Sequence, residues 1–388
     1  MSAPPMALYI HLPWCLRKCP YCDFNSHERS GPLPENTYVD ALLEDLACDL
    51  EILDGARPRV LTSIFIGGGT PSLFSPDAIA RLLEGIATQL PLPAEITLEA
   101  NPGSLEVSRF VGLHQAGISR LSLGIQSFND AHLRRLGRIH DGATALRAVE
   151  TAQQAGFERL NVDLMFGLPG QHTDEALQDI DTALALDVAH ISHYQLTLEP
   201  NTVFYRHPPA LPDEDSIALM QARCGERLRQ AGLVQYEVSA WSRPGHNCHH
   251  NLNYWQYGDY LGLGAGAHGK LSFADENRIL RYRRHRIPDT YLQLDGPRRV
   301  VHCHEVLLRE RPLEFAMNGL RLNAGIPLAL YNNRTGLPDQ TLLDPLTPAL
   351  RQGLAILEAG QLRLTAEGLL HLNELLLPLV PEQTGAKT

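Results

Sequence analysis

The alternation of short apolar runs with helical stretches is the feature that most constrains the fold of this chain. β-rich runs recur at residues 7–11, 61–66, 95–100, 120–125, 159–166 and 190–198. Helical periodicity predicts helices between them, at residues 36–53, 76–90, 104–116, 142–155 and 173–186. Strands separated by helices pair in parallel through crossover connections, so the sequence predicts an α/β fold. Six such units fit a partial (β/α)6 barrel of the TIM type, with the chemistry at the C-terminal ends of the strands.

The alternation stops after about Trp241, and this change predicts three regions. Residues 1–240 are expected to form the barrel. Residues 241–305, which are rich in His, Asn, Gly and aromatic residues, are expected to be a loop-rich segment that closes it. Residues 306–388 are Leu-rich and predict a smaller, mainly helical and winged-helix-like domain, with a β-ribbon near Leu362 and a last helix after it.

Composition excludes several classes of protein. The net charge of −11 argues against a nucleic-acid binder, which usually carries a basic surface. No apolar run approaches the roughly 20 residues that a transmembrane helix needs. The start of the chain lacks the basic residue of a secretory signal. Seven cysteines form an odd set without a regular framework, which predicts a reducing, cytoplasmic environment with free thiolates.

Three of these cysteines form a C-x3-C-x2-C run directly after the first predicted strand, at Cys15, Cys19 and Cys22. Iron–sulfur cubanes are normally held by four thiolates, so three ligands leave one iron open to a small molecule. The spacing is typical of radical S-adenosylmethionine (SAM) enzymes, in which SAM binds a [4Fe–4S] cluster. The alternative is a zinc site with a fourth ligand such as His27.

Polar motifs follow the other predicted strands. Residues 67–71 read Gly-Gly-Gly-Thr-Pro, and glycines allow the backbone to approach a ligand closely. Glu99 and Gln126 end the next two strands. Asp163 lies in a strongly apolar run, and because a buried charge is costly without a partner we expect it to face a ligand or Arg138. The G-x-G-x-x-G sequence at 264–269 lacks a following helix, so we interpret it as a close-packed segment rather than a nucleotide site.

A second group of chemically active side chains lies at residues 246–255, His-Asn-Cys-His-His-Asn-Leu-Asn-Tyr-Trp. Neutral imidazole is the usual axial ligand of haem iron, and Tyr254 and Trp255 offer a flat wall for a macrocycle. The alternative is a polar loop with coincidental histidines. The basic run at 278–286 is either a solvated face or a partner for the carboxylates of a porphyrin.

Taken with the late Gly-Asp-Tyr-Leu-Gly-Leu-Gly-Ala segment at 258–265, these motifs resemble the radical SAM family of oxygen-independent coproporphyrinogen III oxidases over nearly the whole chain. The resemblance implies a radical SAM partial barrel with a cluster on the three cysteines. It also implies a backbone contact to SAM near His268. The other SAM contacts that it implies are Tyr9, Tyr21, Gly68, Gly69, Thr70, Glu99, Gln126, Arg138 and Asp163.

Two departures favour one branch of this family. The oxidases carry a cysteine where this chain has Phe24, and they carry a longer N-terminal extension. The absence of this cysteine and of the longer extension, together with the His-Asn-x-x-Tyr-Trp motif at 250–255, makes this chain similar to the HemW branch of haem chaperones. That branch implies haem binding at His250, with His246, Cys248 and His249 as competing ligands.

The expected function is therefore that of a haem chaperone that passes haem to acceptor haem proteins, membrane-bound respiratory enzymes among them. In that case the cluster orders a surface or drives formation of a homodimer, and SAM cleavage is not part of haem delivery. The alternative is an oxygen-independent coproporphyrinogen III oxidase, which decarboxylates coproporphyrinogen III oxidatively to protoporphyrinogen IX.

Overall fold

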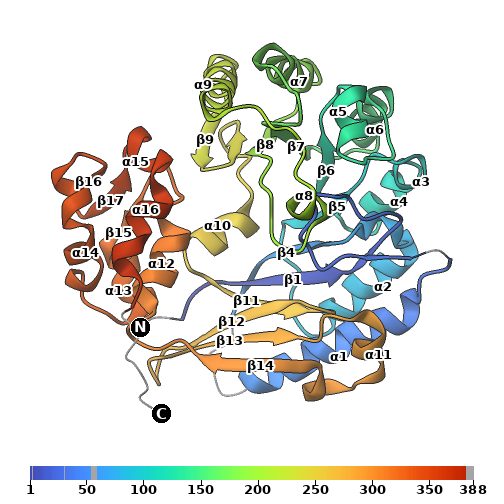
Figure 1. The fold of residues 1–388 in the computed structure, drawn as a ribbon. Helices are drawn as coiled ribbons and strands as arrows, with labels where there is room; N and C mark the ends of the chain where they lie inside the picture. The colour runs from blue at the N-terminus through green and yellow to red at the C-terminus, as the bar shows by residue number, and fades with distance from the viewer. Residues whose placement is uncertain (2, 30, 54–58, 382–388) are drawn as a thin grey trace.

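The computed structural model describes residues 1, 3–29, 31–53 and 59–381, and Figure 1 shows their arrangement. The end of the predicted C-terminal domain, residues 382–388, lies outside them. Six neighbouring strands form the centre of the main sheet, and each adjacent pair is parallel. The predicted α/β fold with six parallel strands is thus confirmed. These strands are β1 (Met6–Leu12), β4 (Leu61–Gly68), β5 (Ile96–Ala100), β6 (Arg120–Gln126), β7 (Arg159–Phe166) and β8 (His190–Gln195).

Each helix that the periodicity predicts is present, with one exception, and three further helices at residues 130–135, 203–206 and 214–230 were not predicted. Residues 104–116 form two short helices instead of one. The Arg109 guanidinium between them bonds to the carbonyls of Ser72 and Leu73, which holds this turn against the 3-10 turn at 71–73. The helices of this region are α1 (Glu35–Leu53), α2 (Pro76–Ala87), α3 (Ser104–Val107), α4 (Phe110–Gln115), α5 (Asp130–Arg135), α6 (Gly142–Gln154), α7 (Thr173–Ala185), α8 (Val203–Arg206) and α9 (Glu214–Gln230).

Residues 241–305 differ from the expected loop-rich segment, because four strands lie within them. β11 (Asp259–Leu263) pairs in parallel with β1, and three antiparallel strands continue the sheet. These are β12 (His268–Phe273), β13 (Arg278–Arg284) and β14 (Val300–Glu305). The sheet therefore has twelve strands and does not close, with β14 at one edge and β9 (Val234–Glu237) at the other, next to β10 (Ala240–Ser242). Helices α10 (His249–Trp255) and α11 (Pro288–Gln293) complete the region.

The C-terminal region packs around a hydrophobic core of its own, which includes Phe315, Tyr331 and Leu346. It lies beside α10 in Figure 1. A small sheet of three short strands supports the helices. The elements are α12 (Arg311–Gly319), β15 (Ile326–Pro327), α13 (Leu328–Thr335), α14 (Gln340–Arg351), β16 (Ala355–Glu358), β17 (Gln361–Leu364), α15 (Ala366–Leu370) and α16 (Leu372–Leu376). In the part of the chain that the structure describes, none of the helices combines the length and apolar character needed to cross a membrane.

A buried ion-pair network fastens the added strands to α1. Asp45 is fully buried, and its carboxylate forms ion pairs with Arg284 at 3.1 Å and Arg299 at 3.2 Å. The same carboxylate accepts the Tyr291 hydroxyl at 2.5 Å, while Arg284 also pairs with Asp49 at 2.8 Å. Buried charges are tolerated when they are paired and hydrogen-bonded in this way. The basic run at 278–286 is therefore partly structural.

We predict that Asp45→Asn lowers the free energy of unfolding by about 3 kcal/mol, because Arg284 and Arg299 would stay buried without a counter-charge. Chemical denaturation followed by circular dichroism measures this loss. The matched control is Asp40→Asn on the same helix, which removes an exposed pair with Arg81 and should cost less than about 1 kcal/mol. Equal losses in the two variants would contradict the network's importance.

Candidate functional site

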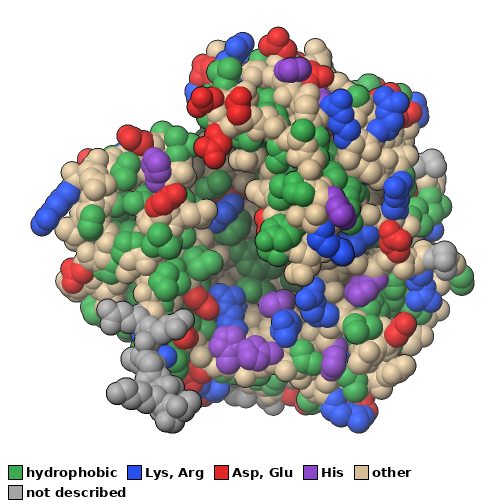
Figure 2. All heavy atoms as spheres, in the orientation of Figure 1, with side chains coloured by type: hydrophobic (Ala, Val, Ile, Leu, Met, Phe, Trp, Pro, Cys, Tyr) green, Lys and Arg blue, Asp and Glu red, His purple; other side chains and the backbone are tan. Residues whose placement is uncertain are grey.

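Two neighbouring cavities open at the C-terminal ends of the parallel strands, and Figure 2 shows the hollowed face. The cysteine cavity has a volume of about 480 Å³ and is lined by residues that include Cys15, Cys19 and Cys22. The histidine cavity has a volume of about 460 Å³ and is lined by residues that include His11, His268 and Arg283. Both volumes lie in the range of small-molecule sites. The linings share Asp23, Phe24, Gly68 and Glu99.

The predicted SAM contacts divide between these cavities. Tyr9 and His268 line the histidine cavity. The others line the cysteine cavity, and they are Tyr21, Gly68, Gly69, Thr70, Glu99, Gln126, Arg138 and Asp163. Residues from the four neighbouring strands β4 to β7 therefore meet around one space next to the cysteines, as a barrel-type fold requires.

The three cysteines lie in the loop around β2 (Trp14–Cys15) and β3 (His27–Glu28), and each thiol has a polar neighbour. The Thr70 hydroxyl donates to Cys15 at 3.5 Å, and the Arg138 guanidinium donates to Cys19 at 3.5 Å. Cys22 lies 3.7 Å from the Ser26 hydroxyl. Burial raises the pKa of the Cys15 and Cys22 thiols. None of the three forms a disulfide.

The structure also shows the surroundings of His27, the residue that the zinc alternative would require. Within the described residues, no three His, Cys, Asp or Glu side chains converge on a common metal position. His27, the candidate fourth zinc ligand, bonds at 3.2 Å to Asn25 Oδ1 and at 3.2 Å to the Arg286 carbonyl.

The glycine loop at the end of β4 packs directly against the cysteine loop. A Cβ on Gly69 would lie 2.6 Å from the Trp14 carbonyl oxygen, and a Cβ on Gly68 would lie 2.6 Å from the His11 ring. Gly68 also has a φ of +118°, which favours glycine. The amides at 68–70 donate to Glu99 and to the Leu12 and Trp14 carbonyls. This loop therefore allows a ligand to approach its backbone closely, but its amides at 68–70 already have partners within the protein.

Gln126 adopts a backbone conformation that is unusual for its type, with a φ of +71° at the end of β6. The β6–β7 register shifts at this point, and the Gln126 side chain accepts the Tyr194 hydroxyl at 2.8 Å. Strained residues of this kind concentrate at functional sites because the surrounding structure holds them in place.

Charge is concentrated at the floor of the cysteine cavity. Burial and the nearby Asp163 raise the pKa of Glu99 to about 7. Burial also raises the pKa of Asp163, whose carboxylate accepts the Asn161 amide at 2.8 Å. Arg138 bonds to Asn101 Oδ1 at 2.6 Å and to the Gly124 carbonyl at 2.7 Å instead of pairing with Asp163. The expected pair with Arg138 is therefore not formed, and Asp163 lines the cysteine cavity.

His250, the predicted haem ligand, lies inside the fold. Its ring is 1% exposed, and burial lowers its pKa to about 3. Nδ1 bonds to the Ser63 hydroxyl at 3.0 Å and Nε2 bonds to the Tyr254 hydroxyl at 3.1 Å. Iron ligation by His250 would have to displace one of these partners. The alternative ligand Cys248 is fully buried as well.

The rest of the motif on α10 reaches both cavities. Tyr254 lines the histidine cavity, whereas Asn251 and Trp255 line the cysteine cavity. The helix begins on the Glu95 carboxylate, which accepts the amides of His249 at 3.1 Å and His250 at 2.9 Å. This short helix therefore forms part of the wall of both spaces.

Sequence reasoning missed several lining residues. Asn101 donates to Thr70 and accepts from Arg138, and its place directly after the third strand was a usable signal. Tyr194 lies in β8, whose sequence His-Ile-Ser-His-Tyr-Gln forms no motif that singles it out. Arg283 lies in the basic run at 278–286, and no sequence pattern there distinguishes a structural arginine from one that faces a cavity.

The raised pKa of Glu99 predicts a pH dependence of stability. A carboxyl group with a raised pKa binds more protons in the folded state, so its contribution destabilises the fold as the pH rises from about 4.5 to 7. We expect Glu99→Gln to raise the free energy of unfolding of the ligand-free protein above that of wild type. This gain should be about 1 kcal/mol larger at pH 8 than at pH 6. Thermal or chemical unfolding at the two pH values measures the difference. A gain that does not change with pH would contradict the raised pKa.

Comparison with known proteins agrees with this geometry. The Radical SAM superfamily model matches residues 9–183, and the HemN C-terminal domain model matches residues 306–371. The solved structure of the coproporphyrinogen III oxidase HemN from Escherichia coli aligns with a TM-score of 0.80. That alignment has 20% identity and covers 97% of this chain and 90% of HemN. At this identity the likeness establishes the fold, which includes the predicted helical C-terminal region.

Two relatives are similar over almost their whole length. The heme chaperone HemW of Haemophilus influenzae is 47% identical over 376 residues, which cover 96% of this chain and 97% of the relative. The heme chaperone HemW of Escherichia coli is 46% identical over 378 residues, which cover 97% and 98%. The chain therefore belongs to the HemW family within the radical SAM superfamily.

Proposed function

We propose that this protein is a haem chaperone that binds haem and transfers it to acceptor haem proteins. The observation that carries the proposal is the histidine cavity, which adjoins the cysteine cavity and presents imidazole, guanidinium and tyrosine side chains. These groups suit an iron porphyrin with anionic substituents. The names of the relatives support the same ligand. We place the activity in the cytoplasm, with membrane-bound respiratory enzymes among the acceptors.

We propose that the cysteine cavity holds a [4Fe–4S] cluster on Cys15, Cys19 and Cys22. When bound, the cluster provides a redox-active iron with an open position for the amino and carboxylate groups of SAM. Thr70 and Arg138 would stabilise two of the thiolates, because both donate hydrogen bonds to sulfur. The loop's fixed contact with Gly69 would keep the three ligands in register.

SAM would extend from the cluster across the strand ends. Gly68 and Gly69 allow its close approach, while Glu99 and Asp163 place negative charge beside its cationic groups. The remaining proposed contacts in this cavity are Tyr21, Thr70, Gln126 and Arg138. Tyr9 and the backbone of His268 would approach SAM from the histidine cavity.

His250 would serve haem binding as a positioning residue. Its Nε2 fixes the hydroxyl of Tyr254, and the Tyr254 ring forms part of the wall of the histidine cavity. The two rings are perpendicular, at 90°, with centroids 4.8 Å apart. Loss of this contact would loosen the wall without touching the cysteine loop.

An oxygen-independent coproporphyrinogen III oxidase is the second candidate, because all of the proposed SAM contacts line the two cavities. Phe24 favours the chaperone: its side chain is 59% exposed at the border of the two cavities, where the oxidases carry a cysteine. An exposed phenylalanine offers an apolar contact to a ligand and no thiol chemistry.

One anaerobic experiment separates the two functions. Reconstituted protein is incubated with SAM, a reductant and coproporphyrinogen III, and a matched sample is titrated with haem. We expect no protoporphyrinogen, together with saturable haem uptake and a shifted Soret band. Formation of protoporphyrinogen would establish the oxidase instead, and absence of haem uptake would refute the chaperone.

We further propose that the cluster orders a surface for homodimer formation and that SAM cleavage is not part of haem transfer. Cys19→Ser should lose the cluster's visible absorbance and shift the protein from dimer to monomer in analytical ultracentrifugation. Cys303→Ser, at an exposed cysteine on β14, is the matched control and should keep both properties. A cluster-free Cys19→Ser protein that still dimerises and transfers haem normally would refute this role.

A further inference from the structure

The strands beyond β11 align basic and imidazole side chains on one face of the sheet. The antiparallel register pairs His268 of β12 with Arg283 of β13, and Arg283 with His302 of β14. Directly paired residues in antiparallel strands project from the same face of a sheet. Figure 2 shows Lys, Arg and His side chains gathered below the hollow, over this part of the fold.

Arg283 differs from the other arginines of its strand because the fold does not use its charge. Arg284 pairs with Asp45 and Asp49, and Arg281 pairs with Glu314 at 2.8 Å. Among the described residues, Arg283 forms no ion pair, and its buried Nε has no hydrogen-bond partner. Its side chain lines the histidine cavity instead. An unpaired guanidinium in a cavity indicates an anionic ligand.

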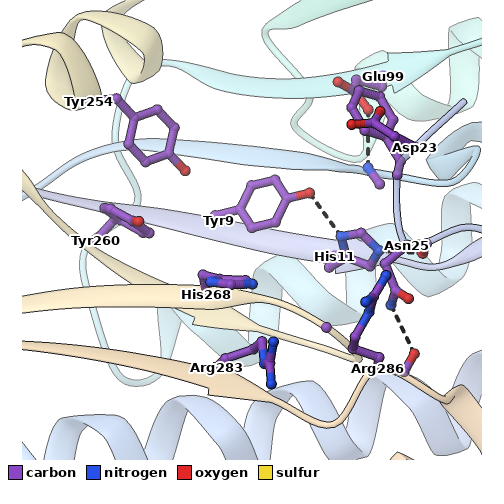
Figure 3. Close-up of a pocket in the computed structure, with 13 residues that line it drawn as sticks. Tyr9, His11, Asp23, Asn25, Glu99, Tyr254, Tyr260, His268, Arg283 and Arg286 are labelled. Atoms are coloured by element: carbon purple, nitrogen blue, oxygen red, sulfur yellow. Dashed lines mark hydrogen bonds between the residues drawn. The ribbon is translucent and has the colours of Figure 1, made fainter. Parts of the chain in front are cut away.

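His268 is the imidazole of the histidine cavity that remains open to a ligand. The other cavity histidine, His11, donates from Nε2 to the Asn25 carbonyl at 2.9 Å and bonds through Nδ1 to the Tyr9 hydroxyl at 2.9 Å. The ring of His268 makes no hydrogen bond to the described residues and is exposed to the cavity. Figure 3 shows it between Tyr9 and Arg283, with Tyr260 beside it.

Aromatic rings and a second arginine complete the site. Tyr254 and Tyr260 meet edge to face, at 85° with centroids 4.7 Å apart, and form one side of the cavity with Tyr9. Arg286 lines the cavity near Asn25. The space thus offers flat apolar walls, a free metal ligand and two cationic side chains. A planar metal macrocycle with carboxylates at one edge has matching chemistry.

We propose that haem occupies the histidine cavity, with His268 as an axial ligand of the iron and Arg283 and Arg286 as partners of the two propionates. The assignment rests on the proposed haem-chaperone function and specifies where and how haem is held. The cluster and most of the proposed SAM contacts lie in the cysteine cavity. The proposed contact of SAM with His268 uses its backbone, so the imidazole ring stays available to the iron. The contact to the iron and the contacts to the propionates come from different residues, so separate substitutions can test each of them.

The test is a titration of cluster-loaded wild type and variants with haem, followed by Soret absorbance and electron paramagnetic resonance. His268→Ala should raise the haem Kd by about tenfold or more and remove the spectral signature of the histidine ligand. The same variant should bind metal-free protoporphyrin as wild type does. His302→Ala, on the same face of the next strand but outside the cavity lining, is the matched control and should match wild type with haem.

Arg283→Gln provides an independent arm. It should weaken haem binding by about tenfold while the iron keeps the wild-type spectrum, because the charge-assisted bond to a propionate is lost and the axial ligand is not. Haem dimethyl ester lacks the negative charges and should bind equally to wild type and Arg283→Gln. Arg278→Gln on the same strand removes an arginine paired with Glu276 and should leave haem affinity unchanged.

The outcomes separate this assignment from the proposed function. If wild type binds no haem, both fail. If wild type binds haem, and His268→Ala and Arg283→Gln keep wild-type affinity and spectra, the assignment fails and the chaperone function stands. If His302→Ala lost the spectral signature of the histidine ligand and His268→Ala kept it, the iron ligand would be His302 on the edge strand β14. Circular dichroism of each variant shows that lost binding does not reflect lost folding.

Discussion

The contact between the glycine loop and the cysteine loop is the constraint on which the rest of the site depends. No side chain fits at Gly69, because the Trp14 carbonyl occupies the space that a Cβ would need. The amides of Gly69 and Thr70 then bond to the carbonyls of Leu12 and Trp14 at 2.8 Å each. The end of β4 therefore fixes the position of Cys15, and Thr70 can reach its sulfur. Strand β5 joins the same assembly through Glu99, which accepts the Gly68 amide.

Helix α10 gives the site its second organising contact. A single carboxylate, Glu95, receives the first amides of the helix, and His250 anchors its side to Ser63 in β4. Because successive side chains point in different directions around a helix, Tyr254 and Trp255 face separate cavities. One turn of helix thus places two aromatic walls, and its histidine supports them from within the fold.

The parts of the fold that the sequence predicts well are those with local signals. Alternating apolar runs located the six parallel strands, and the spacing of Cys15, Cys19 and Cys22 located the loop beside them. The strands between 259 and 305 were missed because their stabilising partners are remote. Arg284 reads as a solvated charge until it meets Asp45 and Asp49, more than 200 residues away in the chain. His250 appears available to a ligand until Ser63 and Tyr254 occupy its nitrogens.

Strand β1 has a consequence for the order in which the chain is made. It lies between β4 and β11, so one of its edges is completed early and the other only when Asp259–Leu263 has been synthesised. At synthesis rates of roughly 5–20 residues per second, that delay is on the order of tens of seconds. During this delay, the edge of β1 that will pair with β11 has no partner strand. The cysteine loop is therefore synthesised well before strands β12 and β13, which supply His268 and Arg283 to the histidine cavity.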